Sequence, residues 1–312
     1  MPVRHVLLAI GVTAMWGFNF IAIHLSLNAF PPFLLAALRF SLIAIPTVLF
    51  VPRPRVHWRW LIGYGLGFGI IQFAFLYWGM AAGMPPGLAS LVLQASAPFT
   101  VLLGAVFLRE RMSRMRTVGI VIAVAGLFVV GWQRSEHAAL LPFMLTLIGA
   151  FGWALGNICV RQAQAEEPFR LTLWMSVVPP IPFFALSLVF EGPDRIAEAV
   201  SGAFTADGLS ATLGLLYTVT IATIAGSGIW TWLMARHPAA MVAPFSLLVP
   251  VFGMTAAWVC FGETTRPGEL AGALLVVAGV LIATTVAPRP GNVAARRYSR
   301  EIGSPGGTSR ST

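Results

Sequence analysis

The sequence contains no lysine, has 2 cysteines among 312 residues, and is poor in charge, with 10% charged residues. A soluble domain of this length carries about 25% charged residues, so water is not the main solvent of this chain. The cysteines, Cys159 and Cys260, lie inside apolar stretches with no CxxC spacing and no neighbouring histidine. Neither a disulfide framework nor a metal site is therefore expected.

Carboxylates are absent from the interior of every long apolar stretch. Most proton- or sodium-coupled carriers use such a group within the membrane. The sequence also lacks a Walker motif, a glycine-rich nucleotide loop, a His-Glu-x-x-His motif and the buried Asp pair of an intramembrane enzyme. We therefore expect no cofactor, no enzymatic activity and no direct ATP coupling within this chain.

The charge that remains is strongly basic, with 20 arginines against 11 acidic residues and a formal net charge of +9. A basic protein can neutralise nucleic-acid phosphates. Here the arginines occur in short clusters between apolar stretches, and no basic face with interleaved aromatic residues can be assembled from them. Nucleic acid is therefore not an expected partner, and we interpret the arginines as a topology signal.

Long apolar runs dominate the chain, which is 57% hydrophobic with a mean hydropathy of +0.82. About 20 apolar residues in a helix cross a bilayer core, and a helix satisfies its own backbone there. The first run lacks a clear small-x-small cleavage site, which favours an uncleaved first span over a signal peptide. Ten spans are predicted, within a few residues at each end: Val6 to Leu27, Pro32 to Val51, Trp60 to Ala82, Pro86 to Leu108, Thr117 to Trp132, Leu140 to Val160, Leu171 to Phe190, Leu209 to Met234, Ala240 to Phe261 and Gly268 to Val286.

The arginines orient these spans, because cytoplasmic loops of membrane proteins are enriched in arginine and lysine. With the N-terminus in the cytoplasm, only Arg134, Arg195 and Arg266 fall outside, and Arg39 lies within the membrane. The other sixteen fall on the cytoplasmic side: Arg4, Arg53, Arg55, Arg59, Arg109, Arg111, Arg114, Arg116, Arg161, Arg170, Arg236, Arg289, Arg296, Arg297, Arg300 and Arg310. The sequence therefore predicts an all-α membrane protein of ten transmembrane helices with both termini in the cytoplasm.

The two halves of the chain resemble each other. Equal spacings relate Pro86 and Pro98 to Pro238 and Pro250, and Glu110, Gly119 and Gly126 to Glu263, Gly272 and Gly279. Each half holds five predicted spans, an odd number, so we expect inverted topology, the usual construction of secondary transporters. We divide the chain into a first repeat at 1–134, a second repeat at 135–287, and a disordered basic cytoplasmic tail at 288–312 that lies against anionic membrane lipid.

Five segments carry distinctive patterns: Trp-Gly-Phe-Asn-Phe at 16–20, Leu-Arg-Phe at 38–40, Gln-Phe-Ala-Phe at 72–75, Gly-Met-Pro-Pro-Gly-Leu-Ala-Ser-Leu-Val-Leu-Gln at 83–94 and Ala-Pro-Phe-Ser-Leu-Leu-Val-Pro-Val at 243–251. Together they resemble the EamA family of the drug/metabolite transporter superfamily, from about residue 5 to 287, and the stretch at 83–94 is the most specific. Within that family the chain is most similar to bacterial exporters of the cysteine and O-acetylserine type. The resemblance implies a multi-pass protein of the bacterial inner membrane that moves small amino acids outward.

Substrate identity stays open at this point, because related transporters on one fold carry very different solutes. Other metabolites or drugs, such as nucleosides, aromatic amino acids and toxic cations, are the main alternatives, and a membrane sensor or scaffold is a weaker one. We expect alternating access about a central site, with efflux, exchange or an unrecognised proton site as the possible coupling. The oligomeric state is undetermined, and a monomer is compatible with the sequence.

Polar and aromatic side chains inside the spans are candidates for a substrate pocket, because polar groups in membrane helices generally face the bundle interior or a water-filled cavity. Amides bond either charged end of a zwitterion, and indole faces attract an ammonium. The alternative for each polar residue is a bond to a neighbouring helix, and for each tryptophan it is packing. The candidate substrate-binding residues are Trp16, Asn19, Arg39, Gln72, Phe75, Ser90, Gln94, Trp153, Asn157, Ser227, Trp230 and Ser246.

Arg39 and two membrane prolines have the most distinct alternatives. Arg39 lies about 10 Å deep on the outer side of its span, where it holds a substrate carboxylate bidentately or instead caps helix carbonyls or snorkels outward. Pro98 and Pro250 remove an intrahelical hydrogen bond. They act either as hinges or as a source of free carbonyls for substrate, or they have no role in motion.

Three further features are expected to be structural. Glu110 and Glu263 are interpreted as helix-end residues that pair with arginines or backbone donors. The alternate glycines from Gly63 to Gly69 permit close helix contact. The link from Glu191 to Gly208 is interpreted as a solvated connection with a short amphipathic helix, with a substrate vestibule as the alternative.

Overall fold

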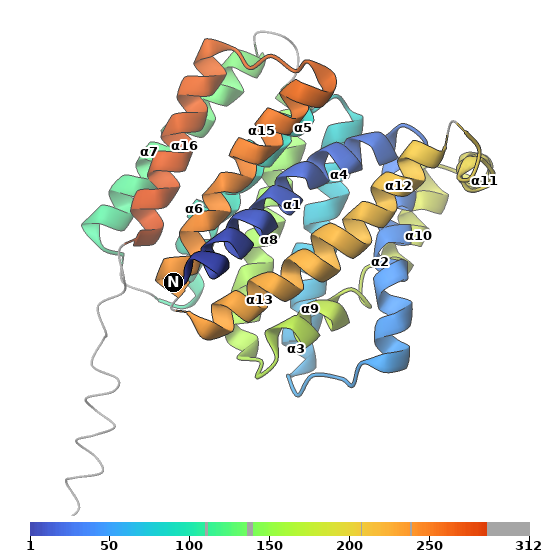
Figure 1. The fold of residues 1–312 in the computed structure, drawn as a ribbon, viewed down its shortest axis with the longest axis horizontal. Coiled ribbons are helices and arrows are strands. Elements are labelled where there is room, and N and C mark those ends of the chain that lie inside the picture. The colour runs from blue at the N-terminus through green and yellow to red at the C-terminus, as the bar shows by residue number, and fades with distance from the viewer. Residues whose placement is uncertain (110–111, 136–139, 207, 238, 286–312) are drawn as a thin grey trace, which may run out of the picture.

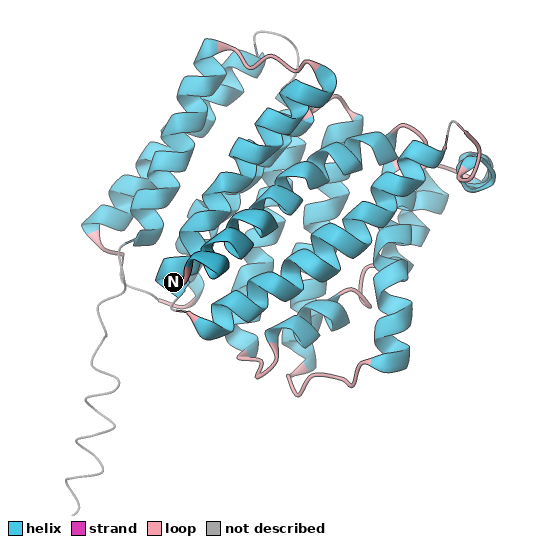
Figure 2. Ribbon diagram, in the orientation of Figure 1, coloured by secondary structure: helices cyan, strands magenta, loops and turns pink. Residues whose placement is uncertain are grey.

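The computed structural model describes residues 1–109, 112–135, 140–206, 208–237 and 239–285. Within these ranges the regular structure is entirely helical (Figure 2), which confirms the predicted all-α class for this part of the chain. Glu110 and the predicted tail at 288–312 lie outside the described residues.

The helices follow the apolar runs, because a helix satisfies its own backbone in an apolar medium. The first half comprises α1 (Val3–Leu27), α2 (Pro32–Phe50), α3 (Trp58–Tyr64), η1 (Gly65–Gln72), α4 (Phe73–Ala81), α5 (Pro86–Val92), η2 (Leu93–Ala95), α6 (Ser96–Phe107) and α7 (Arg114–Ser135). The second half comprises α8 (Leu140–Ala163), α9 (Pro168–Met175), α10 (Pro180–Phe190), α11 (Pro193–Gly202), α12 (Leu209–Tyr217), η3 (Thr218–Gly226), α13 (Ser227–Arg236), α14 (Ala239–Val242), η4 (Ala243–Leu247), α15 (Leu248–Phe261) and α16 (Pro267–Thr285).

Most of these segments are long enough to span a bilayer. In the described part of the chain, 9 of them are sufficiently long and apolar, and the apolar helix over Pro267–Ala283 is shorter. The predicted fifth span, Thr117 to Trp132, is longer in the structure, because helix α7 begins at Arg114 and ends at Ser135. The chain therefore has the helices of a multi-pass membrane protein.

The helix contacts relate the two halves. α1 packs against α12 and α15, whereas α8, which has the matching position in the second half, packs against α4 and α6. α2 packs against α10, and α7 packs against α16 at one edge of the bundle (Figure 1). Exchanging each apolar segment for its counterpart leaves these contacts the same, because α3 and α4 belong to the third segment and α12 and α13 belong to the eighth. The halves therefore interleave, and side chains from both meet in the middle.

Glycines set the close approach of α7 and α16. A Cβ added to Gly119 would lie 2.6 Å from the carbonyl oxygen of Gly279, and one added to Gly126 would lie 2.6 Å from that of Gly272. Real Cβ atoms do not approach backbone atoms this closely, so only glycine allows the two helices to touch. The glycines that recur at equal spacing in the two halves thus pair with each other in space.

The alternate glycines of η1 also lie at helix contacts, as expected. A Cβ on Gly67 would lie 2.7 Å from the backbone nitrogen of Gly156 on α8. On the opposite face, a Cβ on Gly65 would lie 2.5 Å from Val178, and one on Gly69 would lie 2.5 Å from Pro179, both between α9 and α10. This segment is therefore held between two elements of the second half.

The helices depart from α-helical geometry at matching positions in the two halves. The wider π-helical turns η1 and η3 occupy equivalent places in the third and eighth apolar segments. The tighter turns η2 and η4 precede Pro98 and Pro250, which have no N–H to donate. Such departures are frequent at functional sites, and here they surround the candidate residues.

Two carboxylates of the second half cap helices of the first half. Glu191 accepts the backbone N–H groups of Phe33 at 2.7 Å and Leu34 at 3.0 Å at the start of α2, and the Ser187 hydroxyl at 2.7 Å. Glu263 accepts the Gly87 N–H of α5 at 3.2 Å, which confirms its predicted helix-end role. The first N–H groups of a helix have no intrahelical partner, so these carboxylates satisfy donors that would otherwise remain free.

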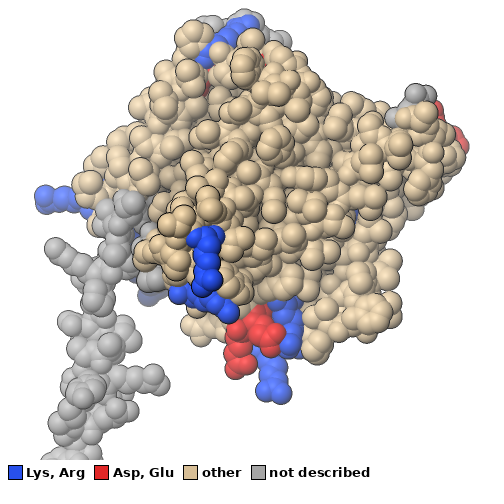
Figure 3. All heavy atoms as spheres, viewed as in Figure 1, with Lys and Arg blue, Asp and Glu red and all other residues tan. Residues whose placement is uncertain are grey.

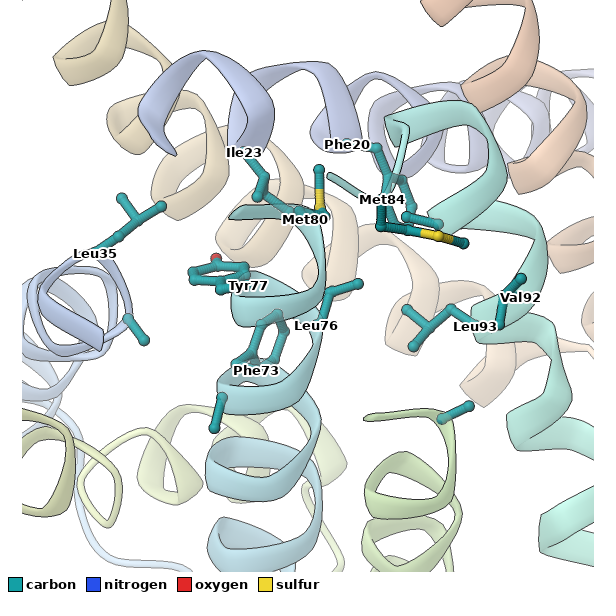
Figure 4. Close-up of a cluster of buried hydrophobic side chains, with 14 of the residues drawn as sticks. Phe20, Ile23, Leu35, Phe73, Leu76, Tyr77, Met80, Met84, Val92 and Leu93 are labelled. Carbon is teal, nitrogen blue, oxygen red and sulfur yellow. The ribbon is translucent and has the colours of Figure 1, made fainter. Parts of the chain in front are cut away.

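The buried apolar core contains side chains from both halves. Figure 4 shows Tyr77 and Met80 of α4 near Ile23 of α1, with Leu35 of α2 to their left and Phe73 of α4 below Tyr77. The charged side chains gather instead near the ends of the bundle and leave a broad uncharged surface between them (Figure 3). The link from Glu191 to Gly208 contains the short helix α11, as predicted.

Candidate functional site

Arg39 lies between the halves and is 5% exposed. Its Nη1 donates to the Tyr77 hydroxyl at 3.0 Å, and its Nη2 donates to Thr223 Oγ1 of η3 at 3.0 Å. The guanidinium carbon lies 3.8 Å from the centroid of the Phe73 ring, within the range of a cation–π contact. The side chain therefore points into the bundle, rather than capping helix carbonyls or reaching the membrane surface.

Trp16 and Trp230 form an aromatic pair with ring centroids 5.1 Å apart. Trp16 Nε1 donates to the carbonyl oxygen of Ala222 in η3 at 2.9 Å. In the second half, Trp153 meets Phe68 of η1 edge-on at 5.9 Å between centroids. Each of the two matching tryptophans thus contacts the π-helical segment of the opposite half.

Gln94 and Ser246 meet across the halves at a proline. An N–H at position 250 would bond the carbonyl of Ser246, four residues earlier in the helix, but Pro250 has none. Gln94 Nε2 donates to this carbonyl at 3.1 Å. A backbone N–H at the end of η4 also donates to this carbonyl, so Gln94 adds a second donor to it from the other half.

The amide side chains of α1, η1 and α8 differ in their hydrogen-bond partners. Asn157 Nδ2 donates to Thr100 Oγ1 at 3.0 Å, which joins α8 to α6. The Oδ1 atom of Asn19 and the Oε1 atom of Gln72 are buried and have no hydrogen-bond partner within the described structure. Because buried polar atoms are generally paired, these two oxygens are available to a bound molecule or to water.

The other candidates have separate contacts. Ser90 donates to the Gly87 carbonyl at 2.6 Å within its own helix. Phe75 stacks on Trp78, with ring centroids 6.3 Å apart. The carbonyl of Ser227 accepts the hydroxyl of Thr231, and an apolar pocket nearby is lined by Leu8, Gly228, Ile229 and Trp232.

Sequence reasoning missed the side chains that bind Arg39. Tyr77 lies one helical turn after Phe73, inside an apolar run, and a tyrosine hydroxyl buried in a membrane needs a partner. Thr223 gave no signal, because its place opposite Arg39 depends on the π-helical turns of η3. Thr100, the partner of Asn157, was also missed, although it lies two residues after Pro98.

The hydrogen bond from Gln94 to the Ser246 carbonyl predicts an energetic coupling between Gln94 and Pro250. Gln94→Leu alone is expected to lower the free energy of unfolding by about 0.5–1.5 kcal/mol, because it removes one hydrogen bond while the Ser246 carbonyl keeps its backbone donor. In a Pro250→Ala background the new N–H can take the place of Gln94 at that carbonyl, so the same substitution should cost less, with a coupling of about 0.5 kcal/mol. Unfolding in detergent of the wild-type protein, the two single variants and the double variant measures this double-mutant cycle.

Pro46 supplies the matched control, since it also lies inside a membrane helix and has no contact with Gln94 among those described. The effects of Gln94→Leu and Pro46→Ala on the free energy of unfolding should be additive. Additivity of Gln94→Leu with Pro250→Ala would contradict the assigned role of Gln94.

Comparison with known proteins gives matches over most of the chain. The sequence profile of the EamA-like transporter family matches residues 3–132 and again residues 140–285. A protein of Salmonella typhimurium named "Probable amino-acid metabolite efflux pump" is 44% identical over 281 residues, which cover 88% of this chain and 93% of that protein. The Escherichia coli protein with the same name is 41% identical over the same shares of both chains.

More distant similarities agree with the fold. A Streptantibioticus cattleyicolor protein named "Probable terminal-alkyne amino-acid exporter" is 27% identical over 86% of this chain and 89% of its own. A protein of known crystal structure superposes with a TM-score of 0.60 at 19% identity, covering 93% of this chain and 100% of its own. At this identity the superposition shows the fold alone.

Proposed function

Because the chain belongs to the EamA-like transporter family, we propose that it exports small amino-acid metabolites of the cysteine and O-acetylserine type across the bacterial inner membrane. It is a multi-pass bacterial membrane protein. The observation that carries the proposal is 44% identity, over 88% of the chain, to a protein named as an amino-acid metabolite efflux pump. The alternative cargo comprises other metabolites or drugs, such as nucleosides, aromatic amino acids and toxic cations.

The architecture that we propose is a pair of inverted five-helix repeats at 1–134 and 135–287, with both termini and the basic tail at 288–312 in the cytoplasm. Three observations support it. The family profile matches twice, the helix contacts persist when the halves are exchanged, and the π-helical segments η1 and η3 occupy matching places. The arginine distribution supports the orientation.

Transport in this proposal proceeds by alternating access, with the repeats rocking about a central site and Pro98 and Pro250 as the hinges. The carboxylate caps lie at the end of the bundle that the proposed orientation places outside. Substrate therefore enters from the cytoplasmic side in this conformation. Breaking the contacts at the outer end then releases it outward.

The proposed site lies between the repeats and is suited to a zwitterion. The unpaired amide oxygens of Asn19 and Gln72 accept hydrogen bonds from an ammonium group, and the paired indoles of Trp16 and Trp230 present aromatic faces to it. The remaining candidates line or support this region: Arg39, Phe75, Ser90, Gln94, Trp153, Asn157, Ser227 and Ser246.

Counterflow in proteoliposomes tests this function. Vesicles that contain the full-length protein and are preloaded with unlabelled cysteine or O-acetylserine should accumulate the labelled solute, whereas protein-free vesicles should not. Uptake that rises with an imposed pH gradient would indicate proton-coupled transport in place of simple efflux. Accumulation of labelled nucleosides or cations, but of no amino acid, would show that the assigned substrate class is wrong.

A further inference from the structure

Arg39 is a buried cation that has no counterion in the part of the chain that the structure describes. Among the described residues, no carboxylate lies within salt-bridge distance of it, and the neutral hydroxyls of Tyr77 and Thr223 are its hydrogen-bond partners. Its Nε atom is buried and has no partner. A charged side chain inside a membrane is costly and usually pairs with another group or serves a transported ion or solute. The cation–π contact with Phe73 offsets only part of that cost.

Four carboxylates of the described residues have partners other than Arg39. Glu191 already accepts three hydrogen bonds at the start of α2. Glu263 accepts a backbone N–H of α5, and Glu269 accepts the N–H of Arg266 in its own helix end. Glu167 pairs with Arg170 at 2.7 Å. These four carboxylates therefore bind groups other than the Arg39 guanidinium.

We propose that Arg39 binds the carboxylate of the transported solute, so that a free carboxylate is required for transport. This inference rests on the proposed function and deepens it. A guanidinium carries five N–H donors in a planar fork that matches a carboxylate bidentately. The hydrogen bonds to Tyr77 and Thr223 use Nη1 and Nη2 once each, which leaves the Nε edge of the fork for the anion.

The position of Arg39 also links carboxylate binding to the movement of the repeats. Tyr77 belongs to the first half and Thr223 belongs to the second, so Arg39 joins the halves through one hydroxyl of each. Thr223 in turn donates to the Thr218 carbonyl of η3 at 2.7 Å. A carboxylate bound at the Nε edge of the guanidinium therefore lies directly beside a contact between the repeats.

Solute chemistry tests this without any mutation. In counterflow of labelled cysteine by the wild-type protein, unlabelled cysteine should compete at least about 30-fold better than its amide or than cysteamine, which lacks the carboxylate, because each leaves the buried charge unpaired. Equal competition by cysteine and cysteamine would overturn the role of Arg39 and leave the exporter intact. A wild-type protein that moves neither compound overturns the proposed function, and the role of Arg39 with it.

Variants locate the discrimination at this residue. Arg39→Gln should raise the KM for cysteine by about 30-fold or more and remove the preference for cysteine over cysteamine, whereas Arg39→Lys should restore part of that preference. Arg170→Gln, which removes an arginine that is paired outside the site, should leave both unchanged. If Arg39→Gln folds and retains the preference, the carboxylate binds elsewhere.

Discussion

Replacing Gly119 by alanine is expected to separate α7 from α16 and to lower the free energy of unfolding by about 1–3 kcal/mol or more. The added Cβ would lie 2.5 Å from the backbone nitrogen of Ala283 and 2.6 Å from the carbonyl oxygen of Gly279. Both are backbone atoms, so no side-chain rotation can relieve the contact and the helices must move apart. Loss of the helix–helix contact removes much of the packing that drives association in a bilayer.

Gly11 provides the matched control on helix α1. A Cβ at that position meets nothing within 4 Å, so Gly11→Ala should be neutral or stabilising by up to about 1 kcal/mol, since alanine is the better helix former. Unfolding in detergent measures both variants. Equal stability of Gly119→Ala and the wild-type protein would show that α7 and α16 are not packed at their glycines.

These glycines illustrate how far the sequence predicted the fold. Their equal spacing indicated an internal repeat, and the apolar runs indicated the membrane helices, because both signals are local. The pairing of Gly119 with Gly279 was not predictable, since spacing fixes the face of a helix and not its partner. The turns η1 and η3 were likewise read as plain helix, because a shift from α- to π-helical bonding depends on tertiary contacts.

The candidate site was predicted in part for the same reason. Arg39 was recognisable as the only arginine within a predicted span, and Gln94 and Ser246 as polar residues in apolar helices. Their partners are set by helices far apart in sequence: Arg39 bonds Thr223 of η3, and Gln94 bonds the Ser246 carbonyl across the halves. Single helical faces show which residues are polar, whereas the assembled bundle decides which of them remain free for a solute.

Replacing Glu191 by glutamine is expected to loosen the contact between α10 and the start of α2. The carboxylate accepts two backbone N–H groups and one hydroxyl, and its two oxygens share these bonds. A glutamine has one oxygen and a donor NH2 in their place, so at least one buried N–H donor faces another donor. Hydrogen bonds to a charged group contribute about 1.5–3 kcal/mol each, and the negative charge at a helix N-terminus adds to this.

The expected loss of stability in Glu191→Gln is therefore about 2–4 kcal/mol, whereas Glu198→Gln, an exposed substitution on α11, should change it by less than about 0.5 kcal/mol. The contact joins the second half to the first at the end of the bundle that we place outside. Its loss should thus also favour opening of that end.

Thiol labelling measures the opening. Met84 is 2% exposed at the turn between α4 and α5, so Met84→Cys, in a protein with Cys159 and Cys260 replaced by alanine, should react slowly with a membrane-impermeant reagent added outside intact cells. Adding Glu191→Gln should raise that rate several-fold, and adding Glu198→Gln should not. An unchanged rate would show that the Glu191 contact does not hold this end closed, and reaction only from the cytoplasmic side would reverse the proposed orientation of the chain.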